Sequence, residues 1–152
     1  MRATQVIGIG NPDRGDDAAG RMVARRLATL RPTLEVLELD GEASALIDCL
    51  GRLDAAYLID ACRSGQAAGT VQRLDASQSP LPADMVGWST HGLGLAAALE
   101  LARALGSLPR RCVVFAIEGR DFAPGAPLSA PVAAAVEVVA ARLAAELMAH
   151  AE

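Results

Sequence analysis

Three short stretches of the sequence place acidic or imidazole side chains beside glycine-rich turns. Asp16 and Asp17 follow the turn that begins at Gly8, Asp60 ends an apolar run, and His91 precedes two further glycines. Two carboxylates and one imidazole form an oxygen, oxygen, nitrogen ligand set with open coordination positions. Such a set suits a divalent metal such as nickel, zinc, iron or manganese. The residue types therefore predict a cation site, provided that the fold brings these stretches together.

Each of these residues also has an ordinary structural explanation. Asp16 and Asp17 could cap a helix and compensate its dipole, which contributes about 0.3–1 kcal/mol for each residue. Asp60 could end its strand as a cap or turn residue, and a lone His91 is commonly a first-turn helix residue in a polar setting. Two adjacent carboxylates after a glycine-rich turn favour a cation site over simple capping. For Asp60 the two readings are evenly balanced.

Several other chemistries are disfavoured by the composition. All 14 basic residues are Arg, which excludes a Walker A lysine and lysine Schiff-base chemistry, and the net charge of −4 argues against nucleic-acid binding. A dinucleotide fingerprint would need a third glycine where Asp13 stands, and acidic residues at the helix start would repel a phosphate. The three cysteines form no CxxC pair and predict neither a disulfide framework nor a zinc site (Cys49, Cys62 and Cys112).

The hydrophobic pattern alternates short apolar runs with amphipathic stretches, which predicts a single α/β domain over residues 1–152. We expect three layers, with a mostly parallel twisted sheet of about five strands flanked by helices. The predicted strands are 5–9, 34–39, 56–61, 70–74 at an edge, and 111–117. The predicted helices are 17–30, 42–53, 91–105 and a long one capped by Ser129. The loop 75–89 is long enough to suggest a functional segment.

The predicted topology joins the three chemical stretches. Asp17 follows the first strand, Asp60 ends the third, and His91 follows the fourth. If the main strands are parallel, these strand ends share the carboxyl edge, where open α/β sheets place their sites. The N-terminus lacks a signal-peptide core and no apolar stretch reaches the roughly 20 residues that span a bilayer. We therefore expect a cytoplasmic protein with no membrane partner and no nucleic-acid partner.

At these positions the sequence resembles the hydrogenase maturation endopeptidases, which process the large subunit of nickel–iron hydrogenases. The resemblance rests on three motifs in order, namely Gly8-x-Gly10-Asn11 through Arg14-Gly15-Asp16-Asp17, then Ile59-Asp60-Ala61, then Ser89-Thr90-His91-x-Leu93-Gly94. It covers essentially the whole chain. It implies a five-stranded sheet flanked by helices and an endopeptidase that removes a C-terminal extension from the large-subunit precursor.

The resemblance also implies which residues form the site. Asp17, Asp60 and His91 match the metal-binding positions, and the metal is nickel already inserted in the substrate, although other divalent metals could occupy the same ligands. Asp17 is Glu in some members, so its carboxylate reaches one methylene less far. The residues expected to contact the substrate are Gly10, Asn11, Asp16, Gly92 and Gly94.

The mechanism and the alternatives stay open at this stage. The metal could polarise a peptide carbonyl or activate water, or it could only dock the substrate while a carboxylate acts as general base. A non-catalytic nickel-binding assembly protein would use the same three ligands, and a nucleotide-binding domain is a more distant rival. A monomer is expected, because no feature of the sequence marks a dimer face.

Overall fold

The computed structural model describes residues 3–82, 86–87 and 94–150. In chain order they form β1 (Thr4–Ile9), the 3-10 helix η1 (Gly15–Ala18), α1 (Ala19–Leu30), β2 (Val36–Leu39), α2 (Ala43–Leu50), β3 (Ala55–Arg63), β4 (Val71–Asp75), β5 (Val86–Gly87), α3 (Leu95–Ala104), β6 (Arg111–Glu118) and α4 (Ala130–His150). The elements follow the predicted order, with one strand, β5, inside the segment that was expected to be a loop.

The sheet is mostly parallel, as predicted. Its main path runs β2-β1-β3-β6-β4, and β5 pairs with the end of β3. The β1–β2, β1–β3 and β3–β6 pairs are parallel, whereas β4–β6 and β3–β5 are antiparallel. The predicted edge position of β4 is therefore confirmed. Because β4 runs antiparallel to β6, it ends at the edge of the sheet opposite to the carboxyl ends of β1, β3 and β6.

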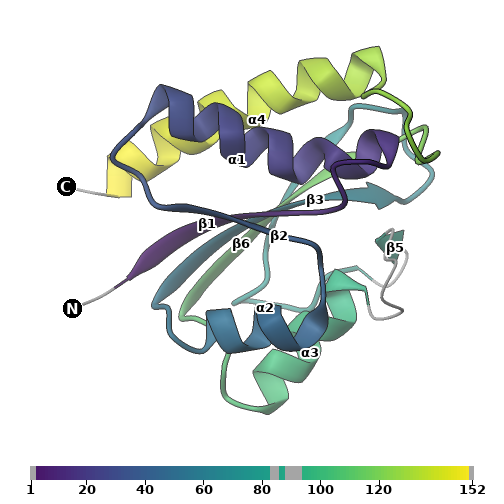
Figure 1. Cartoon of the computed structure of the whole chain (residues 1–152). Coiled ribbons are helices and arrows are strands. Elements are labelled where there is room, and N and C mark those ends of the chain that lie inside the picture. The colour runs from purple at the N-terminus through teal and green to yellow at the C-terminus, as the bar shows by residue number, and fades with distance from the viewer. Residues whose placement is uncertain (1–2, 83–85, 88–93, 151–152) are drawn as a thin grey trace.

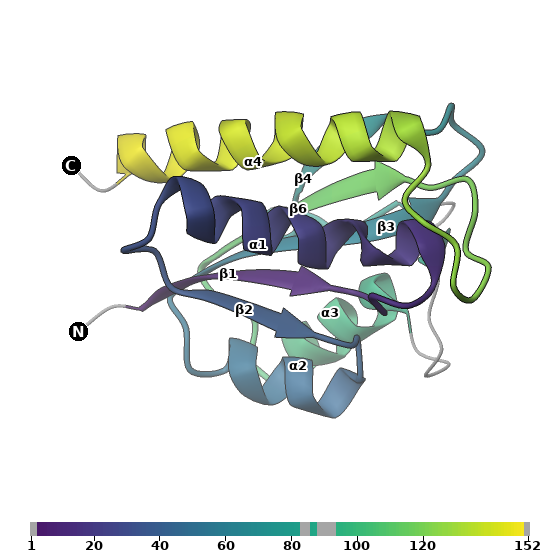
Figure 2. The same cartoon turned by 45° about the horizontal axis from the view of Figure 1, so that its top comes forward.

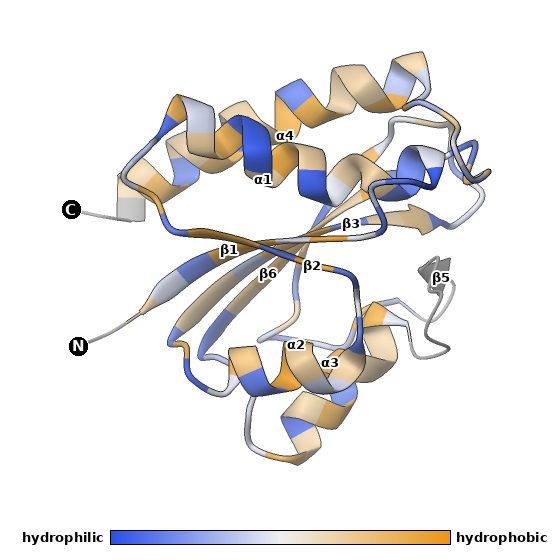
Figure 3. Ribbon diagram, in the orientation of Figure 1, coloured by the Kyte–Doolittle hydropathy of each residue, from blue (hydrophilic) through white to orange (hydrophobic). Residues whose placement is uncertain are grey.

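Helices cover both faces of the sheet, which gives the predicted three-layer α/β fold. Figure 1 shows α1 and α4 on one face and α2 and α3 on the other, and Figure 2 confirms this arrangement from a second direction. The α1/α4 side buries aliphatic residues around Val23, Leu27 and Leu143, and the opposite side buries Leu46, Leu50 and others. The strands are largely apolar while polar positions gather on the outer faces of the helices (Figure 3). Because both sheet faces are covered, the central strands read as continuous apolar runs.

None of the helices within the described ranges combines the length and apolar character needed to cross a membrane. The long helix α4 instead presents its predicted apolar positions to the sheet, and all of them are buried (Val132, Val136, Val139, Leu143 and Leu147). The apolar spacing also predicted inward-facing leucines at the last positions of the helices expected over 17–30 and 91–105, and both predictions are wrong. Leu30 and Leu105 are 42% and 63% exposed, because Leu30 is the last residue of α1 and Leu105 follows the end of α3.

Several helix starts differ from the prediction. The helix expected from residue 17 begins as η1 and becomes α-helical only at Ala19. Glu42 lies outside α2 and caps it, since its carboxylate accepts hydrogen bonds from the Ser44 and Ala45 main-chain N–H groups. Ser129 occupies the predicted position directly before α4, and its carbonyl oxygen accepts a hydrogen bond from the Ala133 N–H. Its hydroxyl donates to Asp16 at 2.9 Å and so also connects the start of α4 to η1.

The strand order reverses between β1 and β3, and this reversal locates the crevice where α/β sheets bind ligands. The chain leaves β1 to one side towards β2 and later returns to the other side as β3. The two connecting helices, α1 and α2, lie on opposite faces (Figure 1). The loop after β1 and the end of β3 therefore meet at a crevice at the carboxyl edge.

The start of α1 packs unusually close to the sheet at this crevice. A Cβ atom on Gly20 would lie 2.2 Å from the carbonyl oxygen of Ile59 and 2.5 Å from that of Ile9. A Cβ on Gly8 would likewise lie 2.3 Å from the carbonyl oxygen of Gly20. Both contacts involve main-chain atoms that cannot rotate away. The contact between helix and sheet therefore requires glycine at both positions, including Gly8 of the turn that superficially suggests a phosphate loop.

This contact predicts that Gly20→Ala destabilises the protein. Overpacking against main-chain atoms should lower the free energy of unfolding by at least about 1–3 kcal/mol, measured by urea denaturation. Gly51→Ala is the matched control, because its nearest neighbour would lie at an ordinary 3.6 Å and its φ is −63°. The control should change stability by no more than about 0.5 kcal/mol. Equal stability of both variants would contradict the close-approach explanation.

Candidate functional site

Asp17 and Asp60 lie at the carboxyl edge of the sheet, on either side of the β1–β3 crevice. Asp17 belongs to η1, directly after the turn that follows β1. Asp60 was predicted to end its strand, but it is the sixth of the nine residues of β3, which continues to Arg63. Both side chains are buried, with exposures of 3% and 8%. One oxygen of each carboxylate, Oδ1, has no hydrogen-bond partner among the described residues. The structure thus brings together two of the three predicted metal ligands, in a setting where charge is poorly solvated.

The electrostatics of the two carboxylates show that they interact. Burial raises the pKa of Asp60 well above its ordinary value, and the negative charge of Asp17 raises it further. Burial also raises the pKa of Asp17, although the Asn11 N–H and the charges of Arg14 and Arg21 partly offset this shift. Two nearby buried carboxylates whose charge Arg14 and Arg21 compensate only in part favour binding either a proton or a cation. The pair therefore has the electrostatic properties of a cation or proton site.

Asp16 has a different environment, although it is adjacent to Asp17 in the sequence. It is fully buried and accepts four hydrogen bonds, from the N–H groups of Arg120 (2.7 Å), Asp121 (3.0 Å) and Ser129 (2.7 Å) and from the Ser129 hydroxyl (2.9 Å). Burial would raise the pKa of Asp16, but these hydrogen bonds outweigh it and lower the pKa. Asp16 therefore anchors the segment between β6 and α4 to η1. Its carboxylate faces into the protein.

The turn after β1 positions Asp17. Gly10 has a φ of +144°, and a Cβ there would lie 1.9 Å from the Asp17 carbonyl oxygen, so only glycine fits. The Asn11 N–H donates to Asp17 Oδ2 at 2.9 Å, while the Asn11 side chain accepts a hydrogen bond from the Asp13 N–H. Arg21 Nε donates to the Gly10 carbonyl oxygen at 2.6 Å. The predicted substrate-contact residues Gly10 and Asn11 thus border Asp17, and whether they contact a substrate stays a prediction.

The third predicted ligand, His91, lies outside the described residues, as does Gly92. Gly94 is described, at the N-cap of α3, and nothing lies within 4 Å of the position that a Cβ would occupy there. The argument that His91 directly follows a parallel strand is wrong, because β4 is antiparallel to β6 and ends at the opposite edge. The chain nevertheless returns, since Val86 and Gly87 of β5 pair with Arg63 and Cys62 at the end of β3 (Figure 1). This pairing places Val86 and Gly87 at the carboxyl edge.

A further buried carboxylate at this edge, Glu118, is absent from the predicted site. It ends β6 opposite Cys62 and accepts hydrogen bonds from the Ser64 N–H at 2.9 Å and from the Ser64 hydroxyl at 2.5 Å. The Cys62 thiol lies 3.6 Å from Glu118, and burial together with this carboxylate raises the pKa of Cys62 to about 12. The thiol is therefore protonated at neutral pH, as expected for an isolated cysteine that is chemically inert. An acidic residue directly after an apolar run, as at Asp60, is the signal that identifies Glu118.

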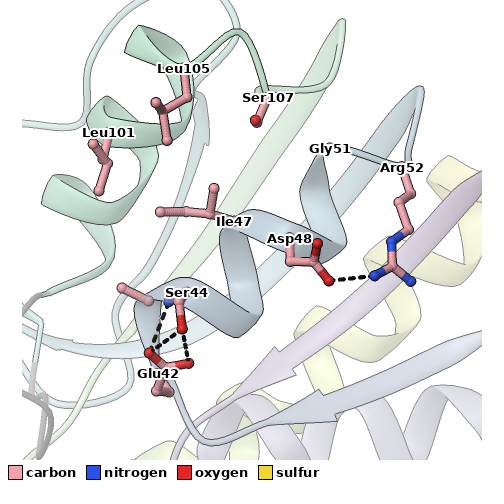
Figure 4. A pocket seen from close by; sticks show the side chains of 10 residues that line it. Glu42, Ser44, Ile47, Asp48, Gly51, Arg52, Leu101, Leu105 and Ser107 are labelled. Atoms are coloured by element: carbon pink, nitrogen blue, oxygen red, sulfur yellow. Dashed lines mark hydrogen bonds and ion pairs between the residues drawn. The ribbon is translucent and has the colours of Figure 1, made fainter.

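A separate hollow lies between α2 and α3, away from the acidic pair. Its volume is about 640 Å³, and Ile47, Leu101 and Leu105 supply its apolar lining. Its charged groups already have partners, as Figure 4 shows, since Glu42 accepts hydrogen bonds from Ser44 and Asp48 pairs with Arg52. The hollow thus contains no unpaired buried charge comparable to Asp17 or Asp60.

Comparison with known proteins places this site in a family. The family model described as "Hydrogenase maturation protease" matches residues 22–146. This range contains Asp60 and His91 and begins five residues after Asp17. No curated protein matches the sequence. The chain belongs to the hydrogenase maturation protease family, and hence to a family of peptidases.

Solved structures agree with this assignment. The hydrogenase maturating endopeptidase HybD from E. coli is 26% identical, with a TM-score of 0.76 over 99% of this chain and 94% of that one. The [NiFe] hydrogenase maturation protease HybD from Thermococcus kodakarensis is also 26% identical, with a TM-score of 0.73 over 97% of this chain and 99% of that one. An endopeptidase from Escherichia coli, at 24% identity, has the same fold, with a TM-score of 0.77 over 97% of this chain and 92% of that one.

The repulsion at the acidic pair predicts that Asp60→Asn stabilises the protein at neutral pH. The raised pKa of Asp60 means that its ionised form is disfavoured in the folded state, so stability is lost as pH rises through the folded pKa. Asn retains the shape and removes this loss. The melting temperature at pH 7 should rise by roughly 2–4 °C, as for about 1 kcal/mol in a chain of this size. A lower melting temperature would show that Asp60 makes a net stabilising contact.

Asp16 should act in the opposite sense. Because its pKa is lowered in the folded protein, its contribution is present above the pKa of the unfolded chain and is lost as pH falls through the folded pKa. Asp16→Asn should lower the free energy of unfolding at pH 7 by about 2 kcal/mol or more, since buried N–H donors lose their acceptor. The variant should also lose less stability between pH 6 and pH 3 than the native chain, measured by urea denaturation at each pH. Parallel pH profiles would contradict the anchoring role.

Proposed function

We propose that the protein removes the C-terminal extension from the precursor of a nickel–iron hydrogenase large subunit after nickel has been inserted. Nickel arrives with the substrate and is recognised by Asp17, Asp60 and His91. Membership of the protease family supports the peptidase activity. The observation that carries the recognition step is the buried pair of interacting carboxylates, each with an oxygen that lacks a hydrogen-bond partner.

The acidic pair provides a physical basis for a metal check. Without a cation, the two carboxylates repel each other in a poorly solvated crevice, and a proton must be bound to relieve the repulsion. A divalent cation carried by the substrate would replace that proton and attract both carboxylates. A precursor that lacks nickel would provide no such attraction. Binding energy would then depend on the metal, and cleavage would follow only after nickel insertion.

Two mechanisms fit these residues. In one, the substrate-borne nickel polarises the scissile carbonyl or activates the attacking water. In the other, nickel only docks the substrate, and a carboxylate accepts the proton of the attacking water. The other predicted properties, cytoplasmic location and a monomeric state, stay predictions.

The decisive experiment compares nickel-loaded and nickel-free large-subunit precursor as substrates, with intact mass spectrometry as the readout. We expect loss of a C-terminal peptide only from the nickel-loaded precursor. Asp17→Asn, Asp60→Asn and His91→Ala should each reduce the cleavage rate by about 10²–10⁴-fold, the range of acid–base and ligand contributions. Asp13→Asn is the matched control, because Asp13 is an exposed carboxylate on the same turn. It should cleave at the native rate.

The same experiment separates the proposed protease from a nickel-binding assembly protein. A protein that binds nickel tightly and stoichiometrically by itself, yet leaves the loaded precursor intact, would support the assembly role. Cleavage of both precursors at equal rates would support a protease without a metal check. Each result would overturn a different part of the proposal.

A further inference from the structure

The outermost strand next to the acidic crevice has a free edge. β2 pairs only with β1 in the described part of the chain. The carbonyl oxygens of Glu35 and Leu39 accept hydrogen bonds from Val6 and Gly10, so the main-chain groups of these alternate residues face β1. The N–H and C=O groups of the residues between them, Val36 and Glu38, therefore point away from the sheet. In Figure 2, β2 lies at the front of the sheet without a neighbouring strand on that side.

Side chains on both faces of this edge could accommodate another chain. On the α2 side, a groove of about 450 Å³ lies beside β2, with Leu37, Leu39 and Leu53 among its apolar residues. On the α1 side, Arg25 and Arg21 both pair with Glu38, at 2.9 Å and 3.5 Å. Two guanidinium groups share the Glu38 carboxylate there, and Arg21 also lies near the Asp17 carboxylate, so the charges on this side are balanced. An extended peptide with apolar residues towards α2 would complement the edge.

The edge leads directly to the candidate site. The Leu39 carbonyl oxygen, at the carboxyl end of β2, accepts a hydrogen bond from the Gly10 N–H at 3.0 Å. Gly10 precedes Asn11, whose N–H binds Asp17. The carboxyl end of β2 therefore contacts the loop that holds Asp17, and a chain that leaves an added strand there would reach this loop by turning over the ends of β2 and β1. The other outer strand, β4, ends at the opposite edge of the sheet, so a chain added there would be directed differently.

β2 also lacks most features by which proteins block exposed edges. Its sequence, Val-Leu-Glu-Leu, contains no proline and no lysine, and its register with β1 is continuous without a bulge. Its single charge, Glu38, is neutralised by the arginines of α1. Unprotected strand edges are the surfaces that proteins use to bind extended peptides by strand addition.

We propose that the free edge of β2 binds the substrate polypeptide as an added strand, by main-chain hydrogen bonds to Val36 and Glu38. The occupant is the extended segment of the precursor next to the scissile bond. This inference rests on the proposed function for the identity of the substrate, and it adds the surface by which the polypeptide is held. The carboxylate pair recognises the cation, whereas the β2 edge fixes the chain that is cut.

Proline substitution tests this edge selectively. Val36→Pro removes an outward N–H group, and its ring obstructs strand addition without removing a hydrogen bond to β1. Val71→Pro is the matched control. Val71 is the first residue of β4, as Val36 is of β2, and both side chains are partly buried against the same hydrophobic core. The main-chain N–H groups of β4 point alternately towards β6 and away from it, and the N–H of Val71 points away, like that of Val36. Sedimentation and thermal melting should show that both variants fold as monomers with similar stability.

With nickel-loaded precursor as the probe, Val36→Pro should lower kcat/KM by about tenfold or more, chiefly through KM, while Val71→Pro cleaves like the native chain. Equal activity of the two variants would overturn the inference and leave the proposed function intact. A change from dimer to monomer on Val36→Pro would also overturn it, because the edge would then bind a second copy.

Hydrogen–deuterium exchange provides a readout that does not depend on folding of the variants or on cleavage. Adding the precursor to the native protein should slow exchange at the amides of Val36 and Glu38, and exchange in 71–75 should not change. If the native protein cleaves no precursor but shows this protection, the proposed function fails and the docking edge is supported. Absence of protection at Val36 and Glu38 would overturn the docking edge whatever the cleavage result.

Discussion

Repulsion between two buried carboxylates is the constraint on which the rest of this site depends. Asp17 and Asp60 come from different sides of the β1–β3 reversal, so the sheet topology itself places like charges together. In water such a pair would separate or be screened, but here helix and strand hold both side chains in place. The remaining features of the carboxyl edge can be understood as the framework that holds this unfavourable pair together.

That framework is built mainly from main-chain contacts. Gly8 and Gly20 allow α1 to approach the sheet until main-chain atoms touch, and Gly10 allows the turn to pass against the Asp17 carbonyl. Asp16 then fixes η1 to the distant segment 120–129 through four hydrogen bonds. Adjacent aspartates thus have opposite roles. The hydrogen bonds to Asp16 stabilise the fold, whereas Asp17 has a raised pKa and one carboxylate oxygen without a hydrogen-bond partner in the described structure. In the proposed function this poorly satisfied charge is the one that recognises the metal.

The sequence pattern predicted the sheet, its mostly parallel direction and the position of Asp17 and Asp60 near its carboxyl edge. These predictions depend on signals between residues that are close in the sequence. Apolar runs define the buried strands, and acidic residues at their ends are conspicuous when both sheet faces are covered. The pattern could not reveal that β4 runs antiparallel or that Ser129 donates to Asp16, because both depend on contacts between distant segments. It also could not separate the roles of Asp16 and Asp17, since adjacent residues of the same type differ only in their tertiary surroundings. Glu118 was not predicted as part of the site because it lies one residue beyond the end of the strand predicted over 111–117.

Strand order and charge together suggest why substrate recognition would be divided between two surfaces. A metal ion alone fixes a point and not the direction of a polypeptide, whereas main-chain hydrogen bonds to a strand edge fix direction and register. β2 is adjacent to β1, and β1 leads into the turn that holds Asp17, so a chain that leaves an added strand at the carboxyl end of β2 would reach the acidic crevice by turning over the ends of β2 and β1. A peptide bond would then be positioned only when both requirements are met. In the proposed function, such a combination of weak main-chain contacts with a cation-dependent contact would make cleavage sensitive to the metal, because tight binding would require both surfaces.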